Sequence, residues 1–126
     1  MFSHIVIGTN DVARAKTFYD ATLGTLGVPP GNLDGDRRVF YRTEGGTLVV
    51  TKPIDGEPAT ASNGATIGFS CTSPEQADAW HAAGLASGGT TCEDPPGLRE
   101  GPGMKLYLAY LRDPDGNKLC ALRWMS

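Results

Sequence analysis

The chain has 126 residues, of which 40% are hydrophobic and 20% charged, and its formal net charge is −3. This length predicts one compact domain with a single core. The acidic balance excludes the basic field expected of a protein that binds nucleic acid or an anionic membrane. No apolar run approaches the roughly 18 residues of a membrane span, and the N-terminus lacks the features of a signal peptide. We therefore expect a cytoplasmic protein with neither a nucleic-acid nor a membrane partner.

The cysteine and glycine content narrows the class of protein further. Cys71, Cys92 and Cys120 are an odd number without CxxC spacing, which predicts free thiols. The 17 glycines and 9 prolines predict several tight turns and argue against a helical bundle.

The first half of the chain begins with a strand and a helix. Residues 4–9 are a short β-branched run, which predicts a strand. Asn10 or Asp11 can then cap a helix through its side-chain oxygen. Apolar residues at helical spacing extend the helix over residues 12–23, and Gly24 and Gly27 follow it.

The same pattern returns in the second half, which indicates an internal repeat. Residues 66–71 predict a strand, Thr72 or Ser73 a helix cap, and Pro74 an early helix position. The apolar positions of the two strand–helix units then correspond without a gap, with Ile5 matching Ile67, Ala15 matching Ala77, Phe18 matching Trp80 and Leu23 matching Leu85. We expect Phe18, Trp80 and Leu85 to pack between helix and sheet.

Each half ends in a predicted hairpin. Residues 37–43 and 47–52 flank a glycine turn, and residues 104–112 and 118–124 flank Asp113-Pro114-Asp115-Gly116-Asn117. Superposing Gly45 on Gly116 places Val49 on Cys120. Residues 53–64 read as a linker, so the halves cover about 1–52 and 65–126 of one domain. The predicted fold is α+β: two βαβββ modules that form a curved mixed sheet with a concave cleft and helices on the outer face.

These motifs resemble the vicinal oxygen chelate superfamily, which includes glyoxalase I, bleomycin-resistance proteins and extradiol dioxygenases. The resemblance rests on a strand opening at His4, a helix containing Phe18-Tyr19, the repeat of this unit, and the terminal turn over residues 113–117. It implies paired modules that commonly assemble as a homodimer with clefts between modules. Exposed strand edges favour such pairing with a second chain.

The resemblance also implies a divalent metal in the family's enzymes. Its four ligand positions fall on His4, Val49, Thr66 and Cys120, and only His4 keeps a residue typical of the family. A catalytic metal generally needs about three protein ligands, and His4 with Cys120 supplies two. We therefore expect no cofactor and no metal at this position. A metal held by other residues stays open as an alternative.

His4 and Cys120 are the two candidates for catalysis, because both alternate with apolar neighbours and should face the concavity. His4 is either a polar group bonded to Thr66 or water, or a binding or acid–base residue. Cys120 is either an inert buried thiol or a nucleophile activated by His4. His81 should lie on the surface.

The expected ligand contacts come from both halves. Residues 93–103 read as a long, proline-stiffened loop that could cover a site, with Arg99 at its centre. The candidate contacts are His4, Val49, Thr66, Cys120, Trp124 and Arg99.

Phosphate-binding glycine loops and a serine nucleophile elbow are absent from the sequence. The leading prediction is a glyoxalase-like protein that binds a small, partly apolar molecule without a metal. One alternative is a metal-dependent lyase, isomerase, transferase or dioxygenase. The other is a homodimeric scaffold without a ligand.

Overall fold

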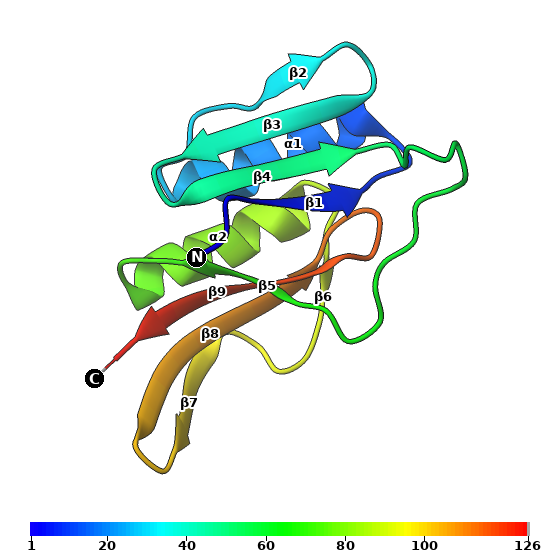
Figure 1. The fold of residues 1–126 in the computed structure, drawn as a ribbon. Coiled ribbons are helices and arrows are strands. Elements are labelled where there is room, and N and C mark those ends of the chain that lie inside the picture. Colours follow the sequence, from blue (N-terminus) through cyan, green and yellow to red (C-terminus); the bar gives the residue numbers. More distant parts are fainter. Residues whose placement is uncertain (126) are drawn as a thin grey trace.

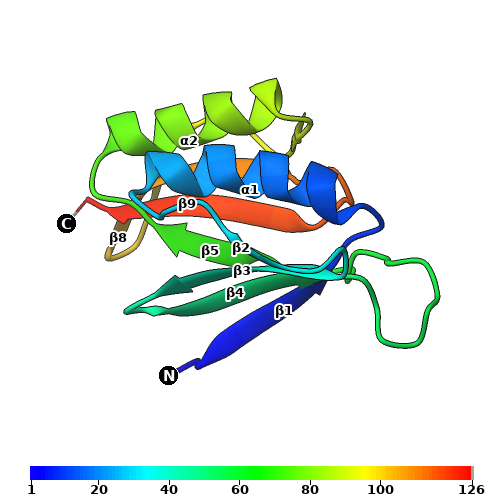
Figure 2. The ribbon, with the colours of Figure 1, turned by 90° about the horizontal axis from the view of Figure 1, so that it is seen from above.

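The two halves of the chain each build one sheet, and both helices lie on the same side of the two sheets (Figures 1 and 2). The structure is a computed structural model that describes residues 1–125. The predicted α+β fold of two βαβββ modules is confirmed. The strands form two sheets rather than one continuous curved sheet, and β1 and β5 each lie at one edge of their sheet.

The first sheet comes from the first half of the chain. Its strands run in the order β1-β4-β3-β2, and β1 pairs with β4 in parallel. Helix α1 joins β1 to the rest of the sheet. The elements are β1 (His4–Gly8), α1 (Val12–Thr25), β2 (Asn32–Asp34), β3 (Arg38–Thr43) and β4 (Gly46–Thr51).

The second sheet repeats this arrangement with residues from the second half. Its order is β5-β9-β8-β6, with β7 also paired to β8. The elements are β5 (Ile67–Ser70), α2 (Pro74–Ala86), β6 (Thr90–Thr91), β7 (Gly97–Gly101), β8 (Met104–Arg112) and β9 (Lys118–Trp124). The predicted arms of the last hairpin match β8 and β9 residue for residue.

The internal repeat is also present in the strand register of the two sheets. Val6 lies opposite Val49 in the first sheet, and the matching positions, Gly68 and Cys120, lie opposite each other in the second. Each pair belongs to a parallel pairing between the first and last strand of its half. Val49 and Cys120 therefore occupy equivalent positions in the structure as well as in the sequence.

Short side chains start both helices as expected. Asp11 caps α1 by accepting a hydrogen bond from the Arg14 backbone N–H, and Ser73 caps α2 by accepting from Gln76 N–H, with Pro74 in the first turn. These bonds satisfy backbone donors that the first helical turn leaves free. Helix α1 continues through Gly24, and the turn after it uses Gly27 at a φ of 86°. No helix within residues 1–125 is long and apolar enough to cross a membrane.

The core fills the space between the helices and the sheets. Phe18, Tyr19 and Trp80 are fully buried there, which confirms the prediction for Phe18 and Trp80. The prediction for Leu85 is wrong, since its side chain is 42% exposed. The buried face of α2 instead runs through Gly84, where a side-chain carbon would come within 2.2 Å of Leu111. The glycine lets α2 pack closely on β8, and Leu85 points away.

The interpretation of residues 93–103 as one loop is also wrong. Strand β7 occupies the middle of this segment and pairs with β8, so that Arg99 lies opposite Leu106. Two other short strands, β2 and β6, fall in segments where no strand was predicted. Each adds to a hairpin edge, where pairing partners rather than hydrophobic alternation decide the conformation.

A buried carboxylate ties the last turn to α1. Asp113, 3% exposed, accepts hydrogen bonds from the Tyr19 hydroxyl at 2.6 Å and the Asn117 side-chain amide at 2.9 Å. Its other oxygen accepts from the backbone N–H groups of Asp115 and Asn117 at 2.9 Å. Four donors satisfy the carboxylate without a cation.

The same turn reaches the end of β1. Asp115 accepts hydrogen bonds from the Thr9 hydroxyl at 2.5 Å and the Asn10 backbone N–H at 2.9 Å, and it pairs with Arg14 at 3.1 Å. Asn117 donates its side-chain amide to the Gly8 carbonyl at 3.1 Å. We call residues 113–117 with these partners the turn clamp. It joins the second half of the chain to the β1–α1 connection of the first.

The turn clamp predicts a large stability loss for Asp113→Asn. The amide would present a donor to groups that are themselves donors, leaving buried polar atoms unpaired. We expect the free energy of unfolding in urea to fall by about 2 kcal/mol or more. Asp36→Asn is the matched control, because the Asp36 side chain is 99% exposed, and it should change stability by less than about 0.5 kcal/mol. Equal effects of the two substitutions would contradict the role of the clamp.

Tyr19 predicts a loss of stability at alkaline pH. Burial, with the nearby Asp113 carboxylate, raises the pKa of Tyr19 well above its ordinary value, whereas an unfolded tyrosine ionises near about pH 10. The unfolded chain therefore releases a proton above about pH 10 that the folded chain retains, and stability falls as pH rises. Tyr19→Phe should flatten this decline in urea unfolding at pH 8 to 11. An unchanged slope in that variant would show that Tyr19 is not responsible.

Candidate functional site

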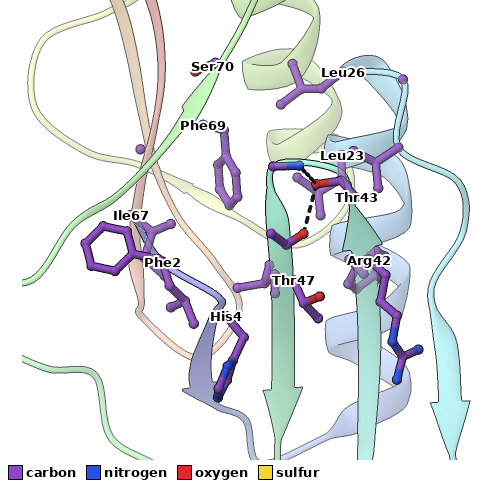
Figure 3. A pocket seen from close by; sticks show the side chains of 18 of the residues that line it. Phe2, His4, Leu23, Leu26, Arg42, Thr43, Thr47, Ile67, Phe69 and Ser70 are labelled. Carbon is purple, nitrogen blue, oxygen red and sulfur yellow. Dashed lines mark hydrogen bonds between the residues drawn. The ribbon is translucent and has the colours of Figure 1, made fainter.

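A cavity of about 600 Å³ opens between the two sheets at the end where β1 begins. Its walls come from the C-terminal end of α1, the β3–β4 hairpin, the start of β1 and strand β5 (Figure 3). This volume lies in the range of small-molecule sites. The edge strands β1 and β5 both line it and do not pair with each other among the described strands.

Most of the wall is apolar. Side chains from α1 and the following turn form one part, and Ile67 and Phe69 of β5 form another (Figure 3). The apolar side chains that line the cavity are Phe2, Ile5, Leu23, Leu26, Val28, Pro29, Leu48, Ile67 and Phe69.

Polar groups line the rest of the cavity. The Thr43 hydroxyl is already hydrogen-bonded within its own hairpin: it donates to the Gly46 carbonyl at 2.9 Å and accepts from Gly45 N–H at 3.2 Å. The polar side chains at the wall are His4, Tyr41, Arg42, Thr43, Thr47 and Ser70.

Tyr41 holds the wall in place rather than offering a reactive group. Its hydroxyl donates to the Asp20 carboxylate at 2.7 Å, which also accepts from Gly31 N–H at 2.9 Å and from Lys16 at 2.5 Å. Burial and the bond to Asp20 raise the pKa of Tyr41, so the phenol stays protonated and ties β3 to α1. Backbone and Lys16 hydrogen bonds outweigh burial at Asp20 and lower the pKa of this carboxyl.

The six candidate contacts from the sequence lie in separate places. His4 lines the cavity, and its ring is hydrogen-bonded with Ser3 Oγ at 2.7 Å rather than with Thr66. Val49 is buried in the middle of β4, and Thr66 is exposed just before β5. Neither lines the cavity.

Cys120, Trp124 and Arg99 belong to the second sheet. Cys120 packs with Leu106 and Leu108 on the side away from the helices, and Trp124 is 58% exposed at the end of β9. Arg99 donates to the carbonyls of its own turn, Asp94 at 3.3 Å and Pro95 at 3.0 Å. Their roles as ligand contacts stay predictions.

The chemistry of Cys120 is that of a protonated thiol. Burial raises the pKa of Cys120, and a thiol rather than a thiolate is a poor nucleophile. His4 lies on the other sheet, with its ring bonded to Ser3. His81, expected at the surface, is half-buried on α2, and burial lowers the pKa of its ring.

The residues at the family's metal positions do not fit a metal. Val49 carries no donor atom, and neutral Thr66 is a weak ligand for the divalent metals involved. Within residues 1–125 no three His, Cys, Asp or Glu side chains gather in a group that could hold a metal ion.

Comparison with known proteins identifies the family. The model of the Glyoxalase/Bleomycin resistance protein/Dioxygenase superfamily matches residues 1–121. The chain belongs to this superfamily. A crystal structure of a glyoxalase/bleomycin resistance protein from Albidiferax ferrireducens T118 is 62% identical, with a TM-score of 0.93 over 97% of this chain and 98% of that one. The predicted resemblance is confirmed.

More distant members of the superfamily show the fold alone. A glyoxalase/bleomycin resistance protein/dioxygenase family enzyme from Burkholderia phytofirmans PsJN is 16% identical, with a TM-score of 0.73 over 98% of both chains. Lactoylglutathione lyase from Agrobacterium tumefaciens is 20% identical, with a TM-score of 0.64 over 97% of this chain and 92% of that one. No curated protein matches the sequence.

Sequence reasoning missed most of the cavity wall. Leu26, Arg42, Thr47 and Phe69 line it, and none was a candidate contact. A signal was present on β3, where Arg38, Phe40 and Arg42 alternate and therefore share one face of the strand.

Thiol labelling tests the state of the cysteines. The three cysteines in residues 1–125 are free, with Cys71 and Cys120 buried and Cys92 half-buried. Burial raises the pKa of both buried thiols. We expect one thiol per chain to react fast with a disulfide reagent at pH 8, and Cys92→Ser to remove that phase. Fast labelling that persists in Cys92→Ser and disappears in Cys120→Ser would instead identify Cys120 as a reactive thiolate.

Proposed function

We propose that the protein binds a small, partly apolar organic molecule in the cavity between its two sheets, without a metal. The observation that carries this proposal is the cavity itself: about 600 Å³, with a mainly apolar wall and several polar side chains among the lining residues. Small-molecule sites typically combine an apolar wall with a few placed polar groups that fix the orientation of the ligand.

Two further observations support the proposal. The relative from Albidiferax ferrireducens T118, 62% identical, carries the name glyoxalase/bleomycin resistance protein. The residues at the family's metal positions, with Val49 and Thr66 among them, do not fit a metal. Binding of a ligand by the apolar and polar side chains of the cavity wall needs no metal.

Filling the cavity tests the proposal. Leu26 lines the cavity at the end of α1, so Leu26→Trp should occupy the space of a ligand. In a thermal-shift screen of small apolar and amphiphilic molecules, a ligand at about 100 times its dissociation constant adds about 2.7 kcal/mol of stability. We expect such ligands to raise the melting temperature of the natural chain but not of Leu26→Trp. Leu85→Trp, at an exposed helix position outside the cavity wall, is the control and should respond like the natural chain.

Two results would contradict the proposal. One is a stabilising ligand that acts equally on both tryptophan variants, because that ligand would bind elsewhere. The other comes from elemental analysis of protein incubated with Zn, Ni, Fe and Mn. About one metal per chain, lost in His4→Ala, would overturn binding without a metal and direct attention to lyase, isomerase or dioxygenase assays.

A further inference from the structure

Three polar side chains form a row across the first sheet at the cavity. Arg42 of β3 lies opposite Thr47 of β4, and Thr47 lies opposite His4 of β1. Residues directly opposite each other on neighbouring strands share one face of a sheet. Figure 3 shows the three side by side on the three strands, and all three line the cavity. We call them the polar row.

Arg42 brings an uncompensated positive charge to this row. Its guanidinium lies 4.4 Å from the centre of the Phe40 ring, and it forms no ion pair with any residue of the described chain. Arg38, on the same strand, also stacks on Phe40, at 5.2 Å, but its Nε donates to the Asp34 carboxylate at 2.8 Å. Arg42 is thus the arginine of this strand whose charge is open to a ligand.

The other two members add hydrogen-bonding groups. The His4 ring uses Nδ1 in its bond with Ser3 Oγ, which leaves Nε2 for a ligand. The Thr47 hydroxyl stands between His4 and Arg42 and can donate or accept. A planar guanidinium offers parallel N–H donors that match the two oxygens of a carboxylate.

We propose that the polar row recognises the carboxylate of an organic acid whose apolar body fills the rest of the cavity. The apolar part of the lining, with Leu26, Ile67 and Phe69, suits that apolar body. A singly charged carboxylate fits better than a phosphate ester, because the row contains one fixed positive charge within a chain of net charge −3. This inference rests on the proposed binding function and names its ligand class.

Matched acids and amides test the inference. Isothermal titration calorimetry would compare naphthaleneacetate and shorter and longer arylalkanoates with their primary amides, which keep the shape and lose the charge. A charge-assisted hydrogen bond contributes about 1.5–3 kcal/mol, so each acid should bind about tenfold or more tightly than its amide. In Arg42→Gln this ratio should fall to about one, while the affinity for the amide stays unchanged.

Arg38→Gln is the matched control. Arg38 lies on the same strand and also stacks on Phe40, but it does not line the cavity. The Arg38→Gln variant should keep the preference for the acid, and circular dichroism would confirm that both variants fold. Equal binding of acid and amide to the natural chain, or an acid preference that survives Arg42→Gln, would overturn the carboxylate inference alone. Failure of every acid and every amide to bind would overturn the proposed binding function as well.

Discussion

The buried carboxylate of Asp113 is the contact on which the arrangement of the two halves depends. A carboxylate without a cation is costly to bury unless its oxygens are fully hydrogen-bonded. Four donors from Tyr19, Asp115 and Asn117 meet that requirement. The bonds fix the last turn in the shape that lets Asp115 and Asn117 reach Gly8, Thr9 and Asn10.

This contact also explains where the cavity lies. The turn clamp holds the C-terminal end of β1 to the second half of the chain, whereas β1 and β5 do not pair within residues 1–125. Figure 2 shows β1 extending from the clamped end toward the N-terminus, as the strand of the first sheet drawn farthest from the helices. Near His4 the two sheets are separate, and the cavity occupies that space. Because the turn clamp holds only the C-terminal end of β1, the two sheets stay apart at its N-terminal end.

Local patterns in the sequence were enough to predict most elements. Alternation and a Pro-Asp-Gly turn located β8 and β9, short polar side chains located both helix starts, and the repeat predicted that Val49 and Cys120 occupy equivalent positions. Leu85 shows the limit of transferring one half onto the other. Its counterpart Leu23 is buried at 3% exposure, but Gly84 draws α2 onto Leu111 and shifts the buried face. A glycine leaves no hydrophobic signal, so the pattern could not reveal this shift.

The candidate site was predictable only in part, for a physical reason. His4 could be placed because strand alternation sets the direction of its side chain. Leu26, Arg42 and Phe69 come from three elements that are distant in sequence, and they meet because two sheets separate at one end. Separation of sheets depends on the whole packing arrangement, which local periodicity does not encode.

The distance between the turn clamp and the polar row has an evolutionary consequence. Residues such as Asp113 and Tyr19 hold the chain together at one end of β1, whereas His4 and Arg42 are exposed near the other. Exchanges at exposed positions usually change stability little. The mouth of the cavity can therefore accumulate new side chains while the scaffold stays above its folding threshold. In a protein whose two modules are joined at one end only, ligand specificity can therefore change during evolution without loss of the fold.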